Sequence, residues 1–392
     1  MSRTLFIHTS SILGGSEKAF LDLVDQYPKS ELGDAFFVLP AEGPLKESLL
    51  GHGISVRRIS IIVWPEKFGR TSRKYPGWSF VWAALSVVGL AKYLFNLRSF
   101  IKRNQISLVY SNGIKCHVLT SVLKSHTAFK LVWHLQDFFP HLRVVDAFLR
   151  VFGTVPDVVI ANSKTVLEDF LQHLPGAWKV PVSRVVHNSV NPQEFLPRQK
   201  LSKNPLIISL VAMLTPWKGQ EVFIDAIDLV RTALPNVEIR AWIVGGEVYR
   251  TAGESGYASK LQNIIDQKQL GAIVELKGLI TDVQSIYNAS EIVVHCSTKP
   301  EPFGRVIVEA MSSECAVIAS RAGGVVEIIE SERDGLLVEP NSPAKLADAI
   351  IRLITDNDFR ARLATEGRKT VIQKFSSEKY ARDIFGELKV LS

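Results

Sequence analysis

Short apolar runs alternate along the whole chain with longer stretches in which apolar residues recur every three or four positions. The short runs are rich in Val, Ile, Leu and Phe, which favours strands. They predict strands at 4–8, 34–39, 54–59, 106–111, 129–134, 157–162 and 183–187, and then at 206–212, 237–244, 273–277, 291–296, 315–320 and 335–338. The longer stretches predict helices that include 15–27, 79–103, 218–234, 255–269 and 342–355. This order is typical of βα units around parallel sheets.

One stretch near the middle of the chain interrupts this alternation. Residues 188–205, "NSVNPQEFLPRQKLSKNP", are rich in Pro, Asn and charged residues and show little periodicity. Because 392 residues are too many for one hydrophobic core, we predict two domains. We expect domains at 1–190 and 205–374, joined by a linker at 191–204, with a last helix at about 375–392 that packs back onto the first domain. Each domain is expected to be a doubly wound, Rossmann-like sheet, and a deep cleft between two such sheets is the natural site.

The composition indicates a soluble globular protein, with 46% hydrophobic and 22% charged residues. Cys116, Cys296 and Cys315 are far apart and form no CxxC pair, so we expect small buried residues in a reducing compartment, with neither a disulfide nor a metal site. The N-terminus begins with a strand pattern and lacks the apolar core and cleavage site of a signal peptide. We therefore expect a cytoplasmic location.

The net charge of +7 is unevenly distributed. Residues 57–103 contain ten Lys and Arg against a single acid, Glu66, and within them "WSFVWAALSVVGLA" (78–91) has no charge. This apolar stretch is shorter than the roughly 20 residues that span a bilayer. It is either a buried helix with a basic flank or a peripheral membrane face that binds anionic headgroups. Nucleic acid is not an expected partner, because no base-stacking module is present.

The most specific chemical signal is "EPFGRVIVEAM" (301–311), with Glu301 after a strand and Glu309 in a helix. Two nearby carboxylates suggest an acid–base pair or solvated surface residues. The apolar neighbours of Glu309 instead indicate a defined partner, and each carboxylate can accept both hydrogen bonds of a vicinal diol. Gly304 lets the backbone come close to a ligand at the start of the helix.

Other candidates follow predicted strands. Gly14 and Gly15 in "SSILGGSEKAF" open the first helix, where backbone N–H groups suit an anion, although a glycine pair alone is a weak signal. Lys218 starts a helix, a place that the helix dipole disfavours for a lysine without an anionic partner. His134 ends a strand with Asp137 near it in sequence, and a structural and a functional role are equally open.

Some patterns are excluded. There is no Walker A loop, no GxSxG elbow and no paired histidine cluster. "DND" (356–358) is similar to a metal-binding DxD but lies between two helices, so we interpret it as a helix cap.

Together these residues resemble the retaining glycosyltransferases of family 4, which have the two-domain GT-B fold. "EPFGRVIVEAM" resembles the E-x7-E signature of that family, and the similarity continues through "AGGVVEII" (322–329), "DGLLVEPNSPAKLADAI" (334–350) and "NDFRARLATEGR" (357–368). "GGSEKAF" and His134 match more loosely, and "HNSVNPQEF" (187–195) resembles the interdomain segment. The resemblance covers nearly the whole chain.

The resemblance implies roles for individual residues. Glu301 would bind hydroxyls of the donor sugar, Glu309 would bind the ribose diol, and Lys218 would neutralise the diphosphate as it leaves. His134 would orient the sugar, so the catalytic set would be His134, Lys218 and Glu301. The donor-binding set would be Gly14, Gly15, Met213, Lys218, Gly245, Gly246, Leu279, Glu301, Pro302, Phe303, Gly304, Arg305, Val306 and Glu309. Met213 stands where many members carry an arginine, and we take Arg305 as a guess for the missing cation.

The implied activity is retaining transfer of a hexose from a nucleotide-diphosphate sugar, with UDP as the expected nucleotide. The acceptor would be a hydroxyl of a lipid-linked glycan or polysaccharide, as in bacterial cell-envelope biosynthesis at the inner membrane face. No cofactor or metal is expected, because Lys218 and helix N-termini supply positive potential. The alternatives are an epimerase or hydrolase acting on nucleotide sugars, and a non-catalytic protein that binds them.

Overall fold

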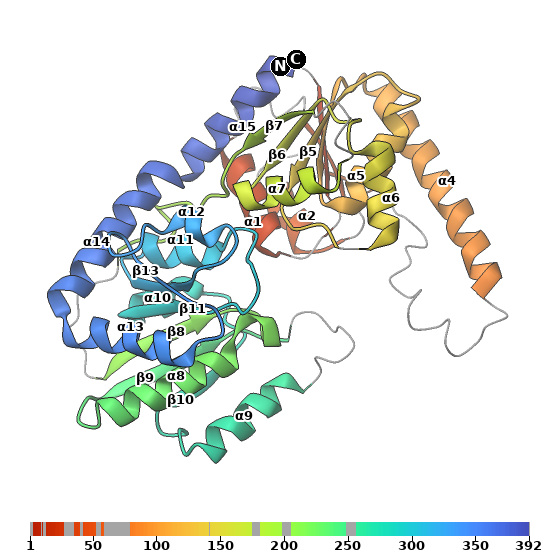
Figure 1. Ribbon diagram of the computed structural model, residues 1–392. Coiled ribbons are helices and arrows are strands. Elements are labelled where there is room, and N and C mark those ends of the chain that lie inside the picture. Colours follow the sequence, from red (N-terminus) through yellow and green to blue (C-terminus); the bar gives the residue numbers. More distant parts are fainter. Residues whose placement is uncertain are drawn as a thin grey trace. The chain divides into compact units, whose positions relative to one another are not determined.

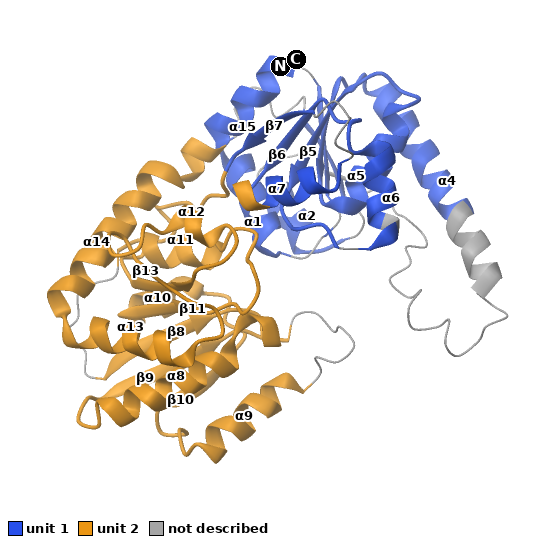
Figure 2. Cartoon of the chain, in the orientation of Figure 1, with its two compact units in different colours: residues 1–162, 166–186, 381–392 blue, residues 163–165, 187–380 orange. Residues whose placement is uncertain are grey.

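The computed structural model (Figure 1) describes residues 3–8, 10, 13–26, 35–39, 42–51, 56–58, 79–140, 142–174, 181–197, 205–247 and 256–391, with the backbone alone at 56–58, 79–87 and 144. The chain divides into two compact units (Figure 2). Unit 1 consists of residues 1–162, 166–186 and 381–392, and unit 2 of residues 163–165 and 187–380. Residues 191–197 of the stretch that we predicted as a linker lie within unit 2, and most of the last helix lies within unit 1.

Unit 1 is built on a seven-stranded sheet in the order β3-β2-β1-β4-β5-β6-β7, with all neighbouring strands parallel. The strands are β1 (Thr4–His8), β2 (Ala35–Leu39), β3 (Val56–Arg58), β4 (Leu108–Asn112), β5 (Lys130–Leu135), β6 (Val158–Ala161) and β7 (Val182–Val185). The helices are α1 (Gly15–Asp25), α2 (Pro44–Gly51), α4 (Ser79–Arg103), α5 (Ile114–Lys124), α6 (Arg143–Phe152), α7 (Lys164–Gln172) and α15 (Ser377–Leu391). The first residues of α7 and α15 belong to unit 2.

Unit 2 is built on a six-stranded parallel sheet in the order β10-β9-β8-β11-β12-β13. The strands are β8 (Leu206–Val211), β9 (Ile239–Val244), β10 (Val274–Gly278), β11 (Ile292–His295), β12 (Ala316–Ser320) and β13 (Leu336–Val338). The helices are the 3-10 helix η4 (Pro216–Lys218), then α8 (Gln220–Ala233), α9 (Tyr257–Gln267), α10 (Val283–Ala289), α11 (Arg305–Ser312), α12 (Val325–Ile328), α13 (Pro343–Thr355) and α14 (Asn357–Lys374).

The alternation of side chains along the strands fills a core on each face of the second sheet. On β11, Ile292 and Val294 pack with α8, α9 and α13, whereas Val293 packs with α10, α11 and α12 on the other face. A strand buried on both faces is apolar along most of its length, which is why Ile292, Val293 and Val294 form a continuous apolar run. The strand is therefore rigid, and its last residue can hold a functional side chain in place.

The secondary structure predicted from the sequence is confirmed. Each predicted strand has a counterpart, and the helix predicted at 79–103 has those bounds. The strand predicted at 106–111 starts two residues later, because Gln105 takes a left-handed conformation (φ 52°) and the N–H of Ile106 bonds back to the helix at Ile101. Asp356 accepts a hydrogen bond from the N–H of Phe359, which confirms the predicted cap. The three cysteines are free and buried, as predicted.

Part of the basic segment 57–103 lies outside the described residues, at 59–78. Within the part of the chain that the structure describes, no helix combines the length and the apolar character needed to cross a bilayer.

Candidate active site

The site of unit 2 lies where the strand order of its sheet changes direction. β8 is followed in the chain by β9 on one side, while β11 pairs with it on the other side. The loops that leave two such strands diverge, so ligands of open α/β sheets bind at the carboxyl ends of these strands. Lys218 follows β8 and Glu301 follows β11, and the topology therefore brings both to this point.

Lys218 and Glu301 form a largely buried ion pair. The Lys218 Nζ donates to Glu301 Oε1 at 2.9 Å and to Oε2 at 2.8 Å. The side chains are only 12% and 13% exposed. The ammonium also lies 4.0 Å from the centre of the Trp217 ring, where the ring face attracts a cation. The predicted diphosphate lysine and the predicted sugar-binding glutamate are thus neighbours.

Two further side chains bind the same carboxylate. Ser297 Oγ donates to Glu301 Oε2 at 3.0 Å, and His295 Nε2 lies 3.2 Å from that oxygen. Burial by itself raises the pKa of Glu301, but the hydrogen bond from His295 and the charge of Lys218 outweigh it and hold that pKa well below its usual range. Glu301 is therefore an anion at any pH near neutrality. Such a group accepts hydrogen bonds and does not donate a proton.

Two glycines allow the loops around this pair to touch. Gly219 (φ 78°) lies so close to Cys296 that a Cβ would be 2.0 Å from the Cys296 carbonyl oxygen. Gly323 (φ 65°) lies against Glu301, and a Cβ there would be 2.2 Å from the Glu301 carbonyl oxygen. Only glycine fits these positions, because both the conformation and the space exclude a side chain. The backbone after Lys218 therefore packs directly against Cys296, and the backbone of Glu301 packs directly against Gly323.

Glu309 lies in α11 and is 4% exposed. Tyr287 donates its hydroxyl to Glu309 Oε2 at 3.0 Å, and Arg305 donates Nε to Oε1 at 2.9 Å. Arg305 also donates Nη1 to the Ser189 carbonyl at 2.9 Å. The defined partner expected for Glu309 is thus present. Each carboxylate oxygen has two acceptor directions, so one contact on each still leaves capacity for a diol.

The segment between the two glutamates ends in a helix N-terminus. Gly304 is the N-cap of α11 at φ 107°, and Phe303, 3% exposed, anchors the loop in the core. Pro302 precedes Phe303, and Arg305 and Val306 begin the first turn, whose N–H groups have no acceptor within the helix. The backbone N–H donors at the start of α11 thus follow Glu301 within a few residues in the sequence.

The remaining residues predicted in unit 2 follow β8, β9 and β10. The Met213 carbonyl accepts a hydrogen bond from Gln220 at 2.7 Å. Gly245 and Gly246 come directly after β9, and a Cβ on Gly246 would lie 3.2 Å from that of Leu279. Leu279 is 70% exposed.

In unit 1, His134 lies near the carboxyl end of β5 and is 1% exposed. Its Nδ1 is 2.5 Å from the Tyr110 hydroxyl, and its Nε2 is 3.0 Å from the amide nitrogen of Gln136. Burial, followed by the nearby His8, lowers the pKa of His134 from 6.5 to about 3. His134 is therefore neutral at physiological pH. A neutral ring can orient a substrate but cannot supply a positive charge.

Gly14 and Gly15 open α1 as predicted, but one of their N–H groups is occupied. The N–H of Gly14 donates to Glu17 Oε2 at 3.0 Å, which is the half of a capping box that the N3 glutamate supplies. Gly15 is the first residue of the helix. Its N–H points out of the helix start, as every first-turn N–H does.

Sequence reasoning missed three residues of the site: His295, Ser297 and Tyr287. His295 is the last residue of an otherwise apolar strand, and that polar interruption is the signal that could have found it. Tyr287 gives no such signal, because its contact with Glu309 spans 22 residues. Within the described ranges, no group of three or more His, Cys, Asp or Glu side chains is arranged to hold a metal ion.

Known proteins share this architecture. Residues 192–370 match the model of the glycosyl transferases group 1 family. An uncharacterized glycosyltransferase of Methanocaldococcus jannaschii is 27% identical over 58% of this chain and 59% of that protein, and a second one is covered to 62% of its length. The chain thus spans about three fifths of these two relatives. The lipopolysaccharide 1,2-N-acetylglucosaminetransferase of Salmonella typhimurium is 25% identical over 79% of each protein.

Solved structures agree over the full length. The Anabaena protein HepE in complex with UDP-glucose superposes with a TM-score of 0.80, 26% identity and coverage of 100% of both chains. This likeness confirms the predicted fold class, the two-domain α/β architecture of GT-B glycosyltransferases. The matched residues 192–370 lie entirely within unit 2 and include Lys218, Glu301 and Glu309. Over residues 192–370 this chain is thus similar to the glycosyl transferases group 1 family.

Proposed function

We propose that this chain is a retaining hexosyltransferase that uses a UDP-sugar and forms a glycosidic bond to an acceptor hydroxyl. The observation that carries the proposal is the contact between Lys218 and Glu301 at the switch point of the second sheet. A diphosphate-linked sugar needs a cation for its phosphates and an acceptor for its hydroxyls. The pair supplies both in one buried place.

In the proposed mechanism the bond between the anomeric carbon and the diphosphate oxygen breaks first. Negative charge develops on that oxygen, and the Lys218 ammonium stabilises it, as do the N–H groups at the start of α11. The acceptor hydroxyl then bonds to the anomeric carbon from the same face, and its proton passes to the leaving phosphate. Glu301 binds the sugar and takes no proton. No metal is needed in this scheme.

We propose how the donor nucleotide sugar binds from the residues that follow the strands of unit 2. Glu309 would accept both ribose hydroxyls, and the backbone at Gly246 and Leu279 would contact the base. HepE was crystallised with UDP-glucose, which supports UDP as the nucleotide here. Met213 supplies no charge, and Arg305 is held by Glu309 and Ser189. We therefore expect Lys218 to be the main cation on the diphosphate.

The acceptor is proposed to be a lipid-linked or polysaccharide glycan at the inner face of a cell membrane. On α4, Val88 and Phe95 are 66% and 72% exposed, and Lys92 and Lys102 are exposed with them. The opposite side of α4 is buried through Tyr93, Leu97 and Ile101. An exposed face of apolar and basic residues suits anionic headgroups. The named activity of the Salmonella relative, on lipopolysaccharide, supports the same class of acceptor.

The activity is tested with the whole chain, UDP-glucose and a polyprenyl-linked glycan acceptor, with and without EDTA. We expect a product that keeps the anomeric configuration of the donor, at a rate that EDTA does not change. Free glucose without acceptor would identify a hydrolase, an isomerised donor an epimerase, and binding without turnover a sensor. A thermal-shift series with UDP-, GDP- and ADP-sugars identifies the base, since a ligand of the folded state raises its stability.

The membrane contact is tested by co-sedimentation with anionic and neutral vesicles. We expect binding to anionic vesicles that weakens with salt. The variant Val88→Ser/Phe95→Ser should bind less, while Leu229→Ser, at a 45% exposed position in unit 2, should not. No binding at any salt concentration would exclude this part of the proposal.

A further inference from the structure

The hydrogen bonds on Glu301 are divided unequally between its two oxygens. Within the part of the chain that the structure describes, Oε1 accepts one, from Lys218 at 2.9 Å. Oε2 accepts from Lys218 at 2.8 Å and Ser297 at 3.0 Å, and it faces His295 Nε2 at 3.2 Å. A carboxylate oxygen has two lone-pair directions, so Oε2 is saturated while Oε1 can accept another hydrogen bond.

His295 is fixed by its place in the fold. It ends β11, pairs with Ala319 of β12 and is 6% exposed. Because the Glu301 carboxylate can only accept, its contact with His295 places an N–H on Nε2. Nδ1 is buried and, among the described residues, has no hydrogen-bond partner. An unsatisfied buried nitrogen destabilises the fold, so the ring is not explained by packing alone.

We propose that His295 is the positioning residue of Glu301, holding Oε2 so that Oε1 is the oxygen offered to a hydroxyl of the donor sugar. The inference rests on the proposed function. Lys218 has three N–H groups, and those that turn to the diphosphate no longer hold Glu301. His295 and Ser297 then keep the carboxylate in place. Among the described residues, Lys218 from η4 and His295 from β11 are the titratable groups that contact the Glu301 carboxylate.

The matched variants are His295→Phe, which keeps a planar ring without the donor, and His295→Gln, which keeps an N–H donor. We expect His295→Phe to lower kcat about 30-fold, with the donor KM within about threefold, as is common when a supporting hydrogen bond is lost. His295→Gln should remain within about fivefold of the wild type. If His295→Phe does not fold, His295→Asn replaces it, because its amide is too short to reach Glu301.

Deoxy donors distinguish positioning from packing. The test uses a series of UDP-glucose analogues, each of which lacks one hydroxyl of the sugar. At one position, loss of the hydroxyl should lower the activity of the wild type strongly and that of His295→Phe hardly at all. In His295→Phe, the hydrogen bond that lowers the pKa of Glu301 is gone, so this pKa rises. The acid limb of the pH profile of kcat should therefore move to higher pH. Equal deoxy penalties and an unchanged acid limb in both proteins would overturn the inference.

A binding measurement separates this inference from the proposed function. Calorimetry with UDP-glucose and with UDP gives the affinity that the sugar adds. We expect this increment to fall about tenfold in His295→Phe and to persist in His295→Gln, while the affinity for UDP stays unchanged. A wild type that binds UDP-glucose without transfer would remove the proposed function alone. An unchanged increment in His295→Phe would remove the role of His295 alone.

Discussion

Lys218 Nζ lies 2.9 Å and 2.8 Å from the two oxygens of Glu301, a residue 83 positions away in the sequence. Both side chains are almost entirely buried. The two groups that we assign to the diphosphate and to the sugar thus neutralise each other before any ligand arrives. A donor that binds here exchanges one set of charged contacts for another and does not have to assemble the site.

Glu301→Gln keeps the shape of the side chain and removes its charge. We expect kcat/KM to fall about 100-fold, since a charge-assisted hydrogen bond to the sugar becomes a neutral one. Stability should fall by about 2 kcal/mol, because Lys218 keeps an acceptor but loses its anion in a buried position. Steady-state kinetics and urea unfolding measure the two effects. Wild-type kcat/KM would contradict the assignment of Glu301 to the sugar.

Lys218→Met removes the cation and keeps most of the apolar side chain. We expect kcat to fall about 1,000-fold, because the charge acts on the leaving diphosphate in the transition state. The control is Lys260→Met, which breaks an exposed ion pair with Glu221 and should leave kcat unchanged. A loss confined to the donor KM would assign Lys218 to ground-state binding only.

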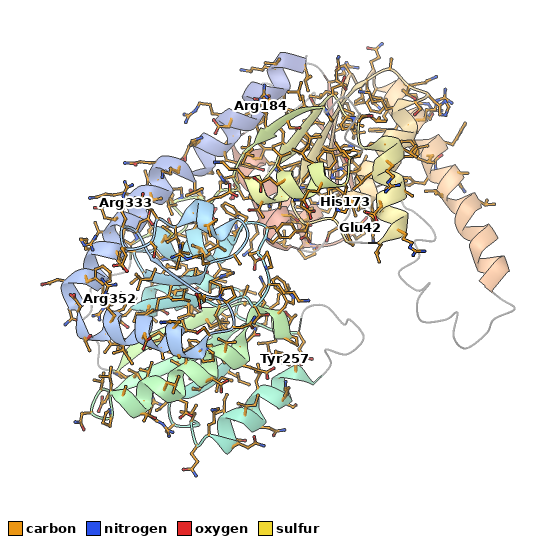
Figure 3. All side chains as sticks on the ribbon, viewed as in Figure 1. Glu42, His173, Arg184, Tyr257, Arg333 and Arg352 are labelled. Carbon is orange, nitrogen blue, oxygen red and sulfur yellow. The ribbon has the colours of Figure 1, made fainter. Side chains whose placement is uncertain are left out.

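Tyr287→Phe tests the support of Glu309. The variant removes the hydrogen bond to Oε2, so we expect a loss of about 1 kcal/mol in stability and a roughly threefold to tenfold weaker affinity for UDP. Tyr257→Phe is the control: its hydroxyl donates to Glu221 (Tyr257 is labelled in Figure 3). That variant should bind UDP like the wild type. Equal affinities in both variants would show that Glu309 needs no help from Tyr287.

Gly219→Ala should destabilise unit 2 by about 3 kcal/mol, because the new Cβ would meet a carbonyl oxygen in a backbone conformation that alanine avoids. Gly386→Ala is the matched control. It lies inside α15, and a Cβ there would meet nothing within 4 Å. We expect this control to be slightly more stable than the wild type, since alanine favours a helix. Thermal unfolding of both variants decides the comparison.

The buried histidines make stability depend on pH. Burial lowers the pKa of His134 to about 3, that of His117 to about 3 and that of His8 to about 4. The unfolded chain, with histidine pKa values near 6.5, binds more protons than the folded chain between pH 6.5 and 4, so stability falls as the pH drops through that range. His134→Gln should reduce this slope by about 1.4 kcal/mol per pH unit. An unchanged slope in denaturant unfolding would mean that His134 is already charged in the folded protein.

The fold could be predicted almost completely because its signal is local. Short apolar runs such as 292–294 mark the strands, and the order of strands and helices then allows few topologies. The positions of Lys218 and Glu301 followed from the same pattern, since each comes directly after a strand.

The contacts within the site were harder to predict, because they depend on tertiary packing. Gly219 and Cys296 are 77 residues apart in the sequence, so the close contact between their loops leaves no periodic pattern that could predict it. Arg305 is a different case. Its proposed role as the substitute cation stays a prediction, and its guanidinium binds Glu309 four residues later, an i,i+4 helix pair that a local rule could have suggested.

The division of the chain sets an order of events during synthesis. Unit 1 contains the first strands but also residues 381–391 of α15, where Glu387 bonds to Arg184 of β7. Unit 2 ends at residue 380 and its sheet at Val338. Domains usually fold as units as the chain is made. Unit 1 is therefore the first to leave the ribosome, and it stays without α15 while the strands of unit 2 fold.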